Sequence, residues 1–479
     1  MRRHWLRLIA VSLLVVVPCF WHRHIEAGDL GSHLYNAWLA RLIDQGRAPG
    51  LWIARQWQNV LFDVALSNIG GLVGLRAAER ICVGGAALLF FWSVFAMLGA
   101  ASRRAPWVLM PCIAMMTYGW TFHAGLFNYY ISCALAFLGL AIFWRGSWRV
   151  RAGVLVLAPL LLLGQVVGVV FLIGAATLLV LDEWIPARYQ LLLPLAAAGL
   201  LAALHAYVSR HFRVEEPKPL EHLINGTDQF AVFGSRYEIL AAAVFALGLA
   251  CIAVDVLVRR REGGFWARYG IPFQLYLCAE AAILLLPSAV YMPQYGAPFS
   301  MTLERVSLFS AAMACGVLAA VRPRWWHAVG FGGAAAVFFA FLYQDTGTLS
   351  RMEDRIDALI RRVPPGARVM ETIATDPEWR NYEANHMVDR ACIGHCFAVG
   401  NYEPATRQFR VRAREGNRIV MTSHVDTEAM ERGDYRVQPR DLPAYQINQC
   451  STDVLDLCAR NLASGETNNG QRGFAAVLR

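Results

Sequence analysis

Three polar residues near the start of the chain, Asp29, His33 and Asn36, have types and a spacing that could do acid–base chemistry. They stand at i, i+4 and i+7, and Leu30 and Leu34 begin an apolar series with a spacing of four in the same segment. Residues at these spacings share one face of an α-helix, so the segment is predicted to form a short amphipathic helix with a separate polar stripe. A carboxylate, an imidazole and an amide on one stripe could take a proton from a substrate hydroxyl and orient it.

The same residues also have purely structural interpretations. Asp29 precedes an apolar periodic run, which is typical of a helix N-cap that stabilises the helix by about 1 kcal/mol. His33 could be a hydrogen-bonding histidine at a membrane surface, along which the apolar stripe of the helix would lie. Glu26 is either a solvated loop acid or a further catalytic carboxylate. The coincidence of these residues within one short segment favours a catalytic site.

The composition indicates what kind of protein must position these residues. Hydrophobic residues make up 57% of the 479 positions and charged residues only 16%, whereas soluble proteins have about 25% charged residues. Residues 1–343 contain the long apolar runs and residues 344–479 resemble an ordinary polar domain. An ordinary soluble protein is therefore excluded. The basic residues stand in short clusters between apolar runs, which disfavours nucleic-acid binding.

The apolar runs predict an α-helical polytopic membrane protein with about eleven transmembrane helices. A bilayer needs about 20 apolar residues per helix. Residues 152–181 are too many for one helix and few for two, and we expect two short helices broken near Gln165, either as thin spans or as a re-entrant pair. Nine other windows fit one span each: 5–21, 80–101, 107–124, 127–145, 189–209, 238–258, 268–291, 303–321 and 325–343.

The basic clusters predict the orientation of the chain. The positive-inside rule places them in the cytoplasm, with the N-terminus inside and the tail outside. Three long segments are then extracytoplasmic: the first outer loop 22–79, the segment 210–237, and the tail 344–479. The clusters are Arg2/Arg3/Arg7, Arg103/Arg104, Arg145/Arg149/Arg151, Arg259/Arg260/Arg261 and Arg322/Arg324.

The tail is predicted to be a separate small α/β or α+β domain. A charged helix over 349–362 would lead through Pro364–Gly366 into a strand at 367–373. Further strands are expected at 409–413, 418–422 and 435–438, and a helix at 453–462. Four cysteines lie in the tail, and in an oxidising compartment they favour two disulfides over a zinc site, with three pairings open. They are Cys392, Cys396, Cys450 and Cys458.

This layout resembles the GT-C superfamily of integral membrane glycosyltransferases. An N-in first helix, a first outer loop with an acidic residue, about eleven spans and an extracytoplasmic C-terminal domain are shared with that superfamily. The segment from Gly28-Asp29 through His33 to Asn36 is similar to the Asp-x-x-x-His start of the first-loop helix in many bacterial members, and Gly125-Leu-Phe-Asn128 is similar to a later motif. The resemblance implies a bacterial inner (cytoplasmic) membrane protein with a periplasmic or extracellular tail.

The resemblance also implies an activity. The chain would move a sugar from a polyprenyl-phosphate donor to an acceptor hydroxyl of a glycan, lipid or protein at the outer membrane face. Asp29 would be the general base of a single inverting displacement, with His33 orienting it or the acceptor. Several members show paired acids, whereas only Glu26-x-x-Asp29 is present here. A divalent cation is therefore one option for this chain and no cofactor is certain.

Other residues are predicted to bind the substrates. Arg305 is the first choice for the donor phosphate, because Glu304-Arg305 stands at the outer start of a membrane helix, where a charge is either paired or binds an anion. Its structural alternative is an interfacial arginine paired with Glu304. The remaining candidates are Asn36, Gln56, Asn59, Asn128, Lys218 and Arg236.

Two alternatives to an enzyme remain at this point. A multi-pass carrier or flippase of lipid-linked glycans would use the broken helices at 152–181 and depend on Glu280 in the span 268–291. No inverted repeat is visible in the sequence, and this disfavours a carrier. A catalytically inactive scaffold with an envelope-binding tail is the other alternative.

Overall fold

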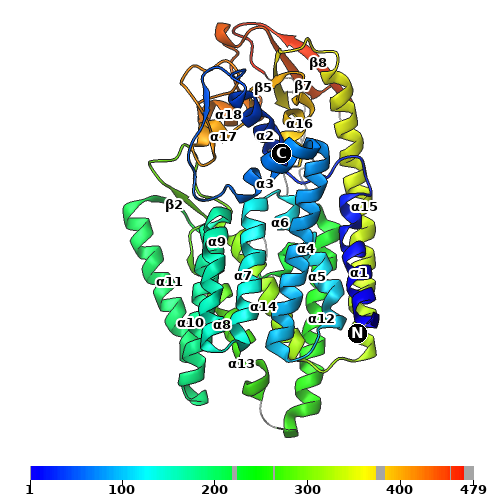
Figure 1. Cartoon of the computed structure of the whole chain (residues 1–479), viewed down its shortest axis with the longest axis vertical. Coiled ribbons are helices and arrows are strands. Elements are labelled where there is room, and N and C mark those ends of the chain that lie inside the picture. Colours follow the sequence, from blue (N-terminus) through cyan, green and yellow to red (C-terminus); the bar gives the residue numbers. More distant parts are fainter. Residues whose placement is uncertain are drawn as a thin grey trace.

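The computed structural model describes residues 2–217, 224–262, 265–373, 383–451, 453 and 455–468. The molecule is elongated, and a bundle of helices carries a layer of short strands and helices at one end, here called the outer layer (Figure 1). Helices of residues 1–343 make the bundle, and a four-stranded sheet of the tail lies in the outer layer. The structure therefore confirms the prediction of a mostly helical protein with helices long and apolar enough to cross a membrane and a small sheet in the tail.

Within the described residues, seven helices are long and apolar enough to cross a membrane. The count of eleven spans stays a prediction, because α1 (Arg2–Val16) is shorter and α13 (Phe265–Leu285) contains Arg268 and Glu280. The seven are α4 (Leu75–Ser102), α7 (Phe127–Arg145), α10 (Val166–Trp184), α11 (Leu192–His211) with the turn before it, α12 (Ser235–Arg259), α14 (Thr302–Ala320) and α15 (Trp325–Ile360).

The window 107–124 is not one helix, contrary to the prediction. It forms η2 (Trp107–Leu109), α5 (Met110–Thr117) and α6 (Trp120–His123), with a break at Gly119. The side chain of Gln229 enters this break and accepts a hydrogen bond from the hydroxyl of Thr121 at 2.8 Å. An inserted side chain that satisfies freed backbone groups is a common cause of a helix break.

The predicted break near Gln165 is confirmed. Helices α8 (Trp148–Gly153) and α9 (Ala158–Gly164) are joined by η3 (Val154–Leu157). Helix α9 ends just before Gln165, and α10 begins just after it, at Val166. The carbonyls freed by the break are satisfied: Ser132 donates to Gln165 O at 2.8 Å, and the backbone N–H groups of Asn59 and Val60 donate to Gly164 O and Leu163 O at 2.9 Å. Irregular backbone inside a membrane domain is stable only when it is satisfied in this way.

Four of the five basic clusters lie together at the end of the bundle opposite the outer layer. Arg104 donates to Ala319 O at 2.8 Å, and Arg145 reaches Ala100 O. Arg259 and Arg322 both form ion pairs with Glu262, at 3.0 and 3.2 Å. The clusters therefore mark one end of the bundle, as the orientation rule requires. That this end faces the cytoplasm stays a prediction.

The first outer loop and the tail are interleaved in the outer layer. Strand β1 (Leu51–Ile53) of the loop pairs antiparallel with β6 (Val411–Ala413) of the tail. Helix α2 (Leu30–Asp44) was expected to keep a polar stripe apart from its apolar stripe, but burial does not separate the two. Leu30, His33 and Asn36, which belong to different stripes of α2, are all buried. The tail packs on the helix through α16 (Met387–Cys392) and covers the polar stripe. That α2 lies along the membrane surface stays a prediction.

The tail sheet has the strand order β5-β4-β7-β8. Strand β4 (Arg368–Thr372) lies parallel to β5 (Phe397–Ala398) and β7 (Ala444–Gln449), and β8 (Leu457–Leu462) is antiparallel to β7. The strands predicted at 367–373 and 409–413 are present in β4 and β6. The predicted helix over 453–462 is wrong, because pairing with β7 makes its second half a strand. No named strand forms at 418–422 or 435–438.

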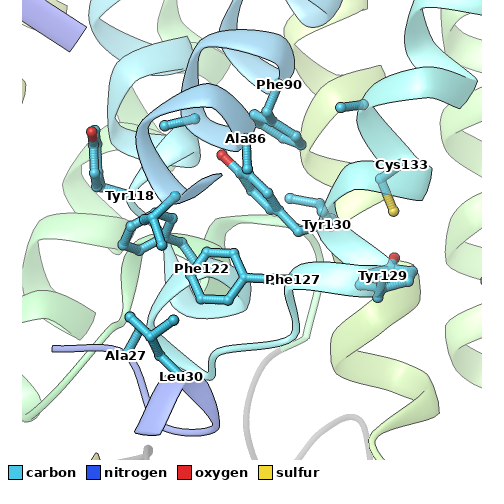
Figure 2. Packing of buried hydrophobic residues seen from close by; sticks show 14 of the residues in the cluster. Ala27, Leu30, Ala86, Phe90, Tyr118, Phe122, Phe127, Tyr129, Tyr130 and Cys133 are labelled. Carbon is cyan, nitrogen blue, oxygen red and sulfur yellow. The ribbon is translucent and has the colours of Figure 1, made fainter. Parts of the chain in front are cut away.

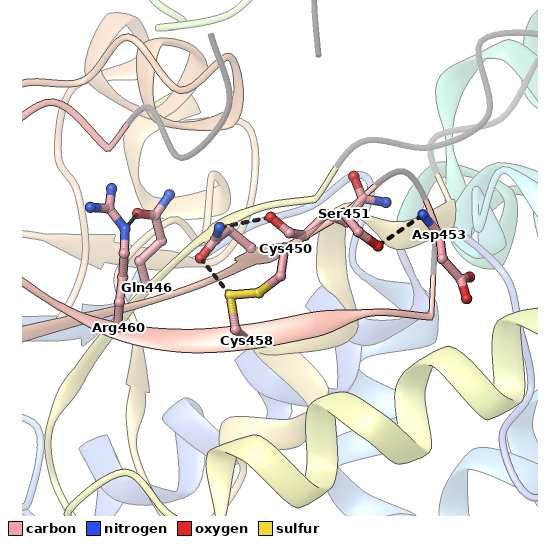
Figure 3. The surroundings of a disulfide bond; sticks show 8 residues. Gln446, Cys450, Ser451, Asp453, Cys458 and Arg460 are labelled. Carbon is pink, nitrogen blue, oxygen red and sulfur yellow. Dashed lines mark hydrogen bonds between the residues drawn. A yellow bond between two sulfur atoms is a disulfide. The ribbon is translucent and has the colours of Figure 1, made fainter. Parts of the chain in front are cut away.

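The four tail cysteines form the pairs Cys392–Cys396 and Cys450–Cys458, whose Cα atoms are 4.7 and 5.9 Å apart. This confirms disulfides over a zinc site and selects one of the three pairings. Figure 3 shows the second pair beside β8, with Gln446 accepting a hydrogen bond from Arg460 on the neighbouring strand. The other seven cysteines are free, as expected for small apolar residues in helices.

The core directly beneath α2 is aromatic. Phe62 stacks on Phe127 with ring centroids 4.7 Å apart, and Phe90 stacks on Tyr130 at 4.5 Å. Figure 2 shows Phe122, Phe127 and Tyr130 between Leu30, at the N-terminus of α2, and Phe90 of α4. Aromatic pairs bury large areas and hold fixed geometries. They provide a rigid base for the N-terminal turn of α2.

Helix α15 joins the two parts of the molecule. It runs without a break from Trp325 to Ile360, through the bundle and into the outer layer (Figure 1). The predicted domain boundary at residues 343/344 therefore falls inside a helix. At its outer end Glu353 is buried and forms an ion pair with Arg390 of α16 at 3.2 Å.

Candidate functional site

A cavity of about 350 Å³ lies between the outer ends of the membrane helices and the tail. The bundle side supplies Asp29, His33, Asn128, Gln165 and Arg305, among others. The tail side supplies His386, Tyr402, Gln408, Phe409, His424, Thr427, Glu428 and Glu431. The volume is in the range of small-molecule sites in proteins. Five residues singled out from the sequence, Asp29, His33, Asn59, Asn128 and Arg305, line this one cavity.

Asp29 does not act as a helix cap. It precedes α2, but its side chain makes no capping hydrogen bond. Its backbone is held against the α6–α7 connection, where Gly28 N donates to His123 O at 2.8 Å and Asp29 N to Ala124 O at 3.3 Å. Gly125 has φ +76°, and a Cβ there would lie 2.3 Å from Asp29 N, so glycine is required for this contact. The backbone of Asp29 is thus fixed at the wall of the cavity, which Asp29 lines.

Arg305, in the first turn of α14, is the second charged group of the cavity wall. Its guanidinium lies over the rings of Phe299 at 4.8 Å and Tyr129 at 5.7 Å. Its Nε and Nη1 atoms are buried and have no hydrogen-bond partner among the described residues. Arg305 forms no ion pair with Glu304 in the described part of the chain, so this structural alternative is not realised. A buried guanidinium with free donors beside a cavity is suited to an anionic ligand.

His33 belongs to a buried cluster in which both carboxylate oxygens of Asp63 are hydrogen bonded. Its Nδ1 lies 2.7 Å from Oδ1 of Asp63. The other oxygen of Asp63 accepts a hydrogen bond from Asn128 at 2.8 Å, and Arg410 of the tail donates to the Asp63 backbone carbonyl at 3.0 Å. Nδ1 of His33 also lies 3.9 Å from Oε1 of Glu403. His33 therefore holds Asp63 and does not contact Asp29 through Nδ1.

The charges of this cluster are set by burial and by pairing. Burial alone would lower the pKa of His33, but the carboxylate of Asp63 outweighs it and raises the pKa to about 9. Burial would raise the pKa of Asp63, and His33 reverses this, so the net shift is downward. Burial and the charge of Asp63 raise the pKa of Glu403 to about 8. At neutral pH the cluster is an imidazolium–carboxylate pair beside a neutral acid.

A second histidine cluster lies on the tail side of the cavity. His386 Nδ1 is 2.9 Å from Oδ2 of Asp389, and Nε2 is 3.7 Å from Oδ1 of Asp29. Burial opposes the protonation of His386, but Asp389 raises its pKa to about 10. Glu371 of β4 completes the cluster, and burial together with the charge of Asp389 raises its pKa well above the usual value. Asp29 is thus approached by an imidazole from the tail.

Among the described residues, three groups of side chains have atoms close enough to one another to hold a metal ion. In each group the potential ligand atoms lie within 4.8 Å of one another. The first two groups border the cavity and the third lies at the outer end of α15. They are His33/Asp63/Glu403, Glu371/His386/Asp389 and His24/Asp354/Asp357.

Several residues predicted from the sequence lie away from the cavity. Glu26 is buried, not solvated, and its charge acts on Arg390. Asn36 exchanges two hydrogen bonds with Asn401, at 2.8 and 3.0 Å. Gln56 donates to Gln408 O at 2.7 Å, and Arg236 pairs with Asp345. Lys218 lies outside the described residues.

The tail side of the cavity was underestimated from the sequence. His386, Tyr402 and Glu403 were not among the residues predicted to form the site. His386 and Glu403 are buried, Tyr402 is half-buried, and His386 and Tyr402 line the cavity. His424, Glu428 and Glu431 of α18 (His424–Glu431) were not considered. The spacing i, i+4, i+7 in α18 repeats the pattern of Asp29, His33 and Asn36, and this is the signal that could have found them.

Comparison with protein-family models, with curated proteins and with solved structures finds no match for this chain. Its function is therefore argued from the cavity itself.

Proposed function

We propose that the chain is a membrane glycosyltransferase that moves a sugar from a polyprenyl-phosphate donor to an acceptor hydroxyl at the outer membrane face. The observation that carries the proposal is the pairing of charges in one cavity: a carboxylate that caps no helix, Asp29, and a buried arginine with free donors, Arg305. Such a pair suits a reaction that takes up a proton at one point and releases a phosphate at another.

The position of the cavity supports an amphiphilic donor. Below it, the bundle exposes large apolar side chains such as Val170, Leu200 and Ile239, each at least 64% exposed. Above it, the tail contributes polar and charged walls. A lipid-linked sugar would place its prenyl chain along the bundle and its phosphate and sugar in the cavity. Arg305 lies where the phosphate would sit, at the outer end of α14.

The proposed reaction is one displacement. The acceptor oxygen forms a bond to the anomeric carbon while the bond from that carbon to the phosphate oxygen breaks, and polyprenyl phosphate leaves. The acceptor proton passes to Asp29. The leaving phosphate needs positive partners more than a general acid, because it is a weak base, and the free Nε and Nη1 donors of Arg305 supply them. Glu428 and Glu431 stand on the opposite, tail wall, where they could contact the acceptor.

The proposal is tested by mass spectrometry of lipid-linked sugars and envelope glycans from the native host. Wild type, a deletion strain, Asp29→Asn and Arg305→Gln are compared at equal protein level. We expect Asp29→Asn to behave like the deletion, with a polyprenyl-phosphate sugar accumulating and one glycan residue missing. We expect at least a hundredfold loss, the contribution typical of a general base. A wild-type glycan profile from Asp29→Asn would contradict the proposal.

Glu280→Gln is the matched control, because a carrier or flippase would depend on Glu280 instead. Glu280 lies away from the cavity and is hydrogen bonded by Ser310. We expect this variant to keep the wild-type glycan profile. A profile that is lost in Glu280→Gln and kept in Asp29→Asn would favour the carrier.

A further inference from the structure

The side chains of Glu371, His386 and Asp389, which are two carboxyl groups and one imidazole, lie close together in the interior of the tail. The three side chains come from β4, from the turn η7 (Glu383–His386) and from α16, so the sheet and the helix fix them independently. Their potential ligand atoms lie within 4.8 Å of one another. Only 8% of Glu371, 6% of His386 and 1% of Asp389 is exposed.

One oxygen atom of this cluster has no hydrogen-bond partner among the described residues. His386 Nδ1 faces Oδ2 of Asp389 at 2.9 Å, and one oxygen of Glu371 accepts a hydrogen bond from the backbone N–H of Val388. The other oxygen, Oε2 of Glu371, is buried and has no hydrogen-bond partner among the described residues. A buried acceptor without a partner is costly and calls for a ligand.

The chemical types of the three groups point the same way. Two carboxyl groups and one imidazole are shut away from water. Buried carboxylates are retained in proteins when they are paired or when they coordinate a metal. A single imidazole together with two carboxylates is a donor set that suits zinc and neighbouring divalent metals, and does not suit calcium or magnesium, which prefer oxygen alone.

We propose that Glu371, His386 and Asp389 bind one divalent transition-metal ion, with zinc as the best match to the ligands. Ligand atoms around a tetrahedral zinc are about 3.4 Å apart. Here Nδ1 of His386 lies 2.9 Å from Oδ2 of Asp389, and all potential ligand atoms lie within 4.8 Å of one another. Small side-chain movements would therefore bring these atoms to the spacing that zinc requires. Three protein ligands leave the fourth position to water.

The ion would also organise the cavity. His386 would bind it through Nδ1, which leaves a proton on Nε2, the atom that lies 3.7 Å from Asp29. A metal-bound histidine commonly donates its other N–H to a carboxylate, which fixes the orientation of both groups. The ion would then hold Asp29 in place from the tail without touching the substrate. This consequence rests on the proposed function, whereas the binding of the ion does not.

The other two groups of possible ligands are less suited to an ion. In the group of His33, Asp63 already accepts from Asn128, and Glu403 accepts from Ser32 at 3.3 Å. In the group at the end of α15, Asp354 is 41% exposed and pairs with Arg23 at 2.7 Å. These groups provide internal controls for the location of the ion.

The test is made on the full chain, purified in detergent, stripped with a chelator and reloaded with zinc chloride alone. Bound metal is measured by mass spectrometry after desalting. We expect about one zinc per chain in wild type, at least a tenfold loss of zinc affinity in Glu371→Gln and Asp389→Asn, and unchanged zinc in Glu403→Gln and Asp354→Asn. We also expect the chelator to lower the melting temperature of wild type and to leave that of Glu371→Gln unchanged.

X-ray absorption at the zinc edge of loaded wild type gives a result even when a variant fails to fold. We expect one imidazole and oxygen ligands in the first shell. Wild type that retains no zinc, zinc that persists in both Glu371→Gln and Asp389→Asn, or zinc lost in Asp354→Asn instead would each overturn the proposal. No sugar substrate is used, so the result is independent of the glycosyltransferase proposal.

Discussion

The two histidine clusters on either side of Asp29 differ in how completely they are satisfied. In the His33 cluster, Asp63 is bonded through both carboxylate oxygens, to His33 and to Asn128. In the His386 cluster, an oxygen of Glu371 stays without a partner. Both clusters are buried and both contain a histidine with a raised pKa. The comparison suggests that the first cluster stabilises the fold and the second is built to bind something.

Among the changes that test this comparison, Asp63→Ala is expected to lower the free energy of unfolding most. It leaves the His33 imidazolium buried without its partner, which typically costs about 3 to 5 kcal/mol. The free energy of unfolding is measured in mixed SDS and detergent micelles. We expect Glu371→Gln, in metal-free protein, to change it by less than about 1 kcal/mol, because the amide keeps the shape of the acid. Equal losses from the two variants would remove the distinction.

Asp354→Ala is the control for Asp63→Ala. It also removes an aspartate beside a histidine, His24, but this aspartate is 41% exposed. Exposed ion pairs contribute about 0 to 1 kcal/mol. A loss as large as that of Asp63→Ala would mean that burial does not decide the effect.

A smaller effect is expected where the first loop meets the tail, beside the satisfied cluster. Asn36 and Asn401 are both fully buried and bond each other. Asn401→Ala leaves the amide of Asn36 without its partner and should cost about 1 to 3 kcal/mol. Replacing both by leucine should cost less than the sum of the two single leucine changes, because neither asparagine is then left without the other. Additive losses in the same unfolding assay would argue against a mutual pair.

The smallest predicted effect is a pH dependence of the melting temperature, which tests the charges of the His33 cluster. The pKa of His33 is raised to about 9 and that of Glu403 to about 8, so the folded state holds more protons than the unfolded state until the pH exceeds these values. The stabilisation from His33 is complete below pH 6.5, that from Glu403 below pH 4.5, and both are lost as the pH rises through 8 to 9. We expect the melting temperature to fall by a few degrees between pH 6.5 and 9.

Glu403→Gln is the matched variant for the pH dependence. Since Glu403 is neutral below its raised pKa, glutamine should leave the melting temperature nearly unchanged at pH 6.5 and should make the fall towards pH 9 shallower. A fall of the same steepness in both proteins would assign the pH dependence to other groups.

Features that depend on residues close together in the chain could be predicted from the sequence. The membrane helices, the break at Gln165 and the cysteine-rich tail follow from hydropathy, glycine positions and cysteine number. Asp29 could be recognised as a candidate because its stripe lies within about two turns of helix. Its rejection as a cap needed the structure, since the side-chain direction is not encoded in the spacing.

Features that depend on pairing between distant segments could not be predicted. Residues 457–462 were assigned to a helix because their local pattern allows one, but β7 imposes a strand. His386 and Tyr402 reach the cavity only because the tail folds back onto α2, and Asn36 and Asn401 are 365 positions apart. Sequence periodicity has no information on such contacts. The unpaired oxygen of Glu371 likewise becomes visible only in three dimensions.

The pairing of β1 with β6 also sets the order in which the molecule can be completed during its synthesis. The chain is made from its N-terminus at about 5 to 20 residues per second, so the first loop emerges roughly tens of seconds before the strand that pairs with it. During that interval β1, Asn36 and the wall around Asp29 have no partners from the tail. The tail wall of the cavity consequently forms late, and a chain that stops before β6 has neither the β1–β6 pair nor the cavity wall from α18.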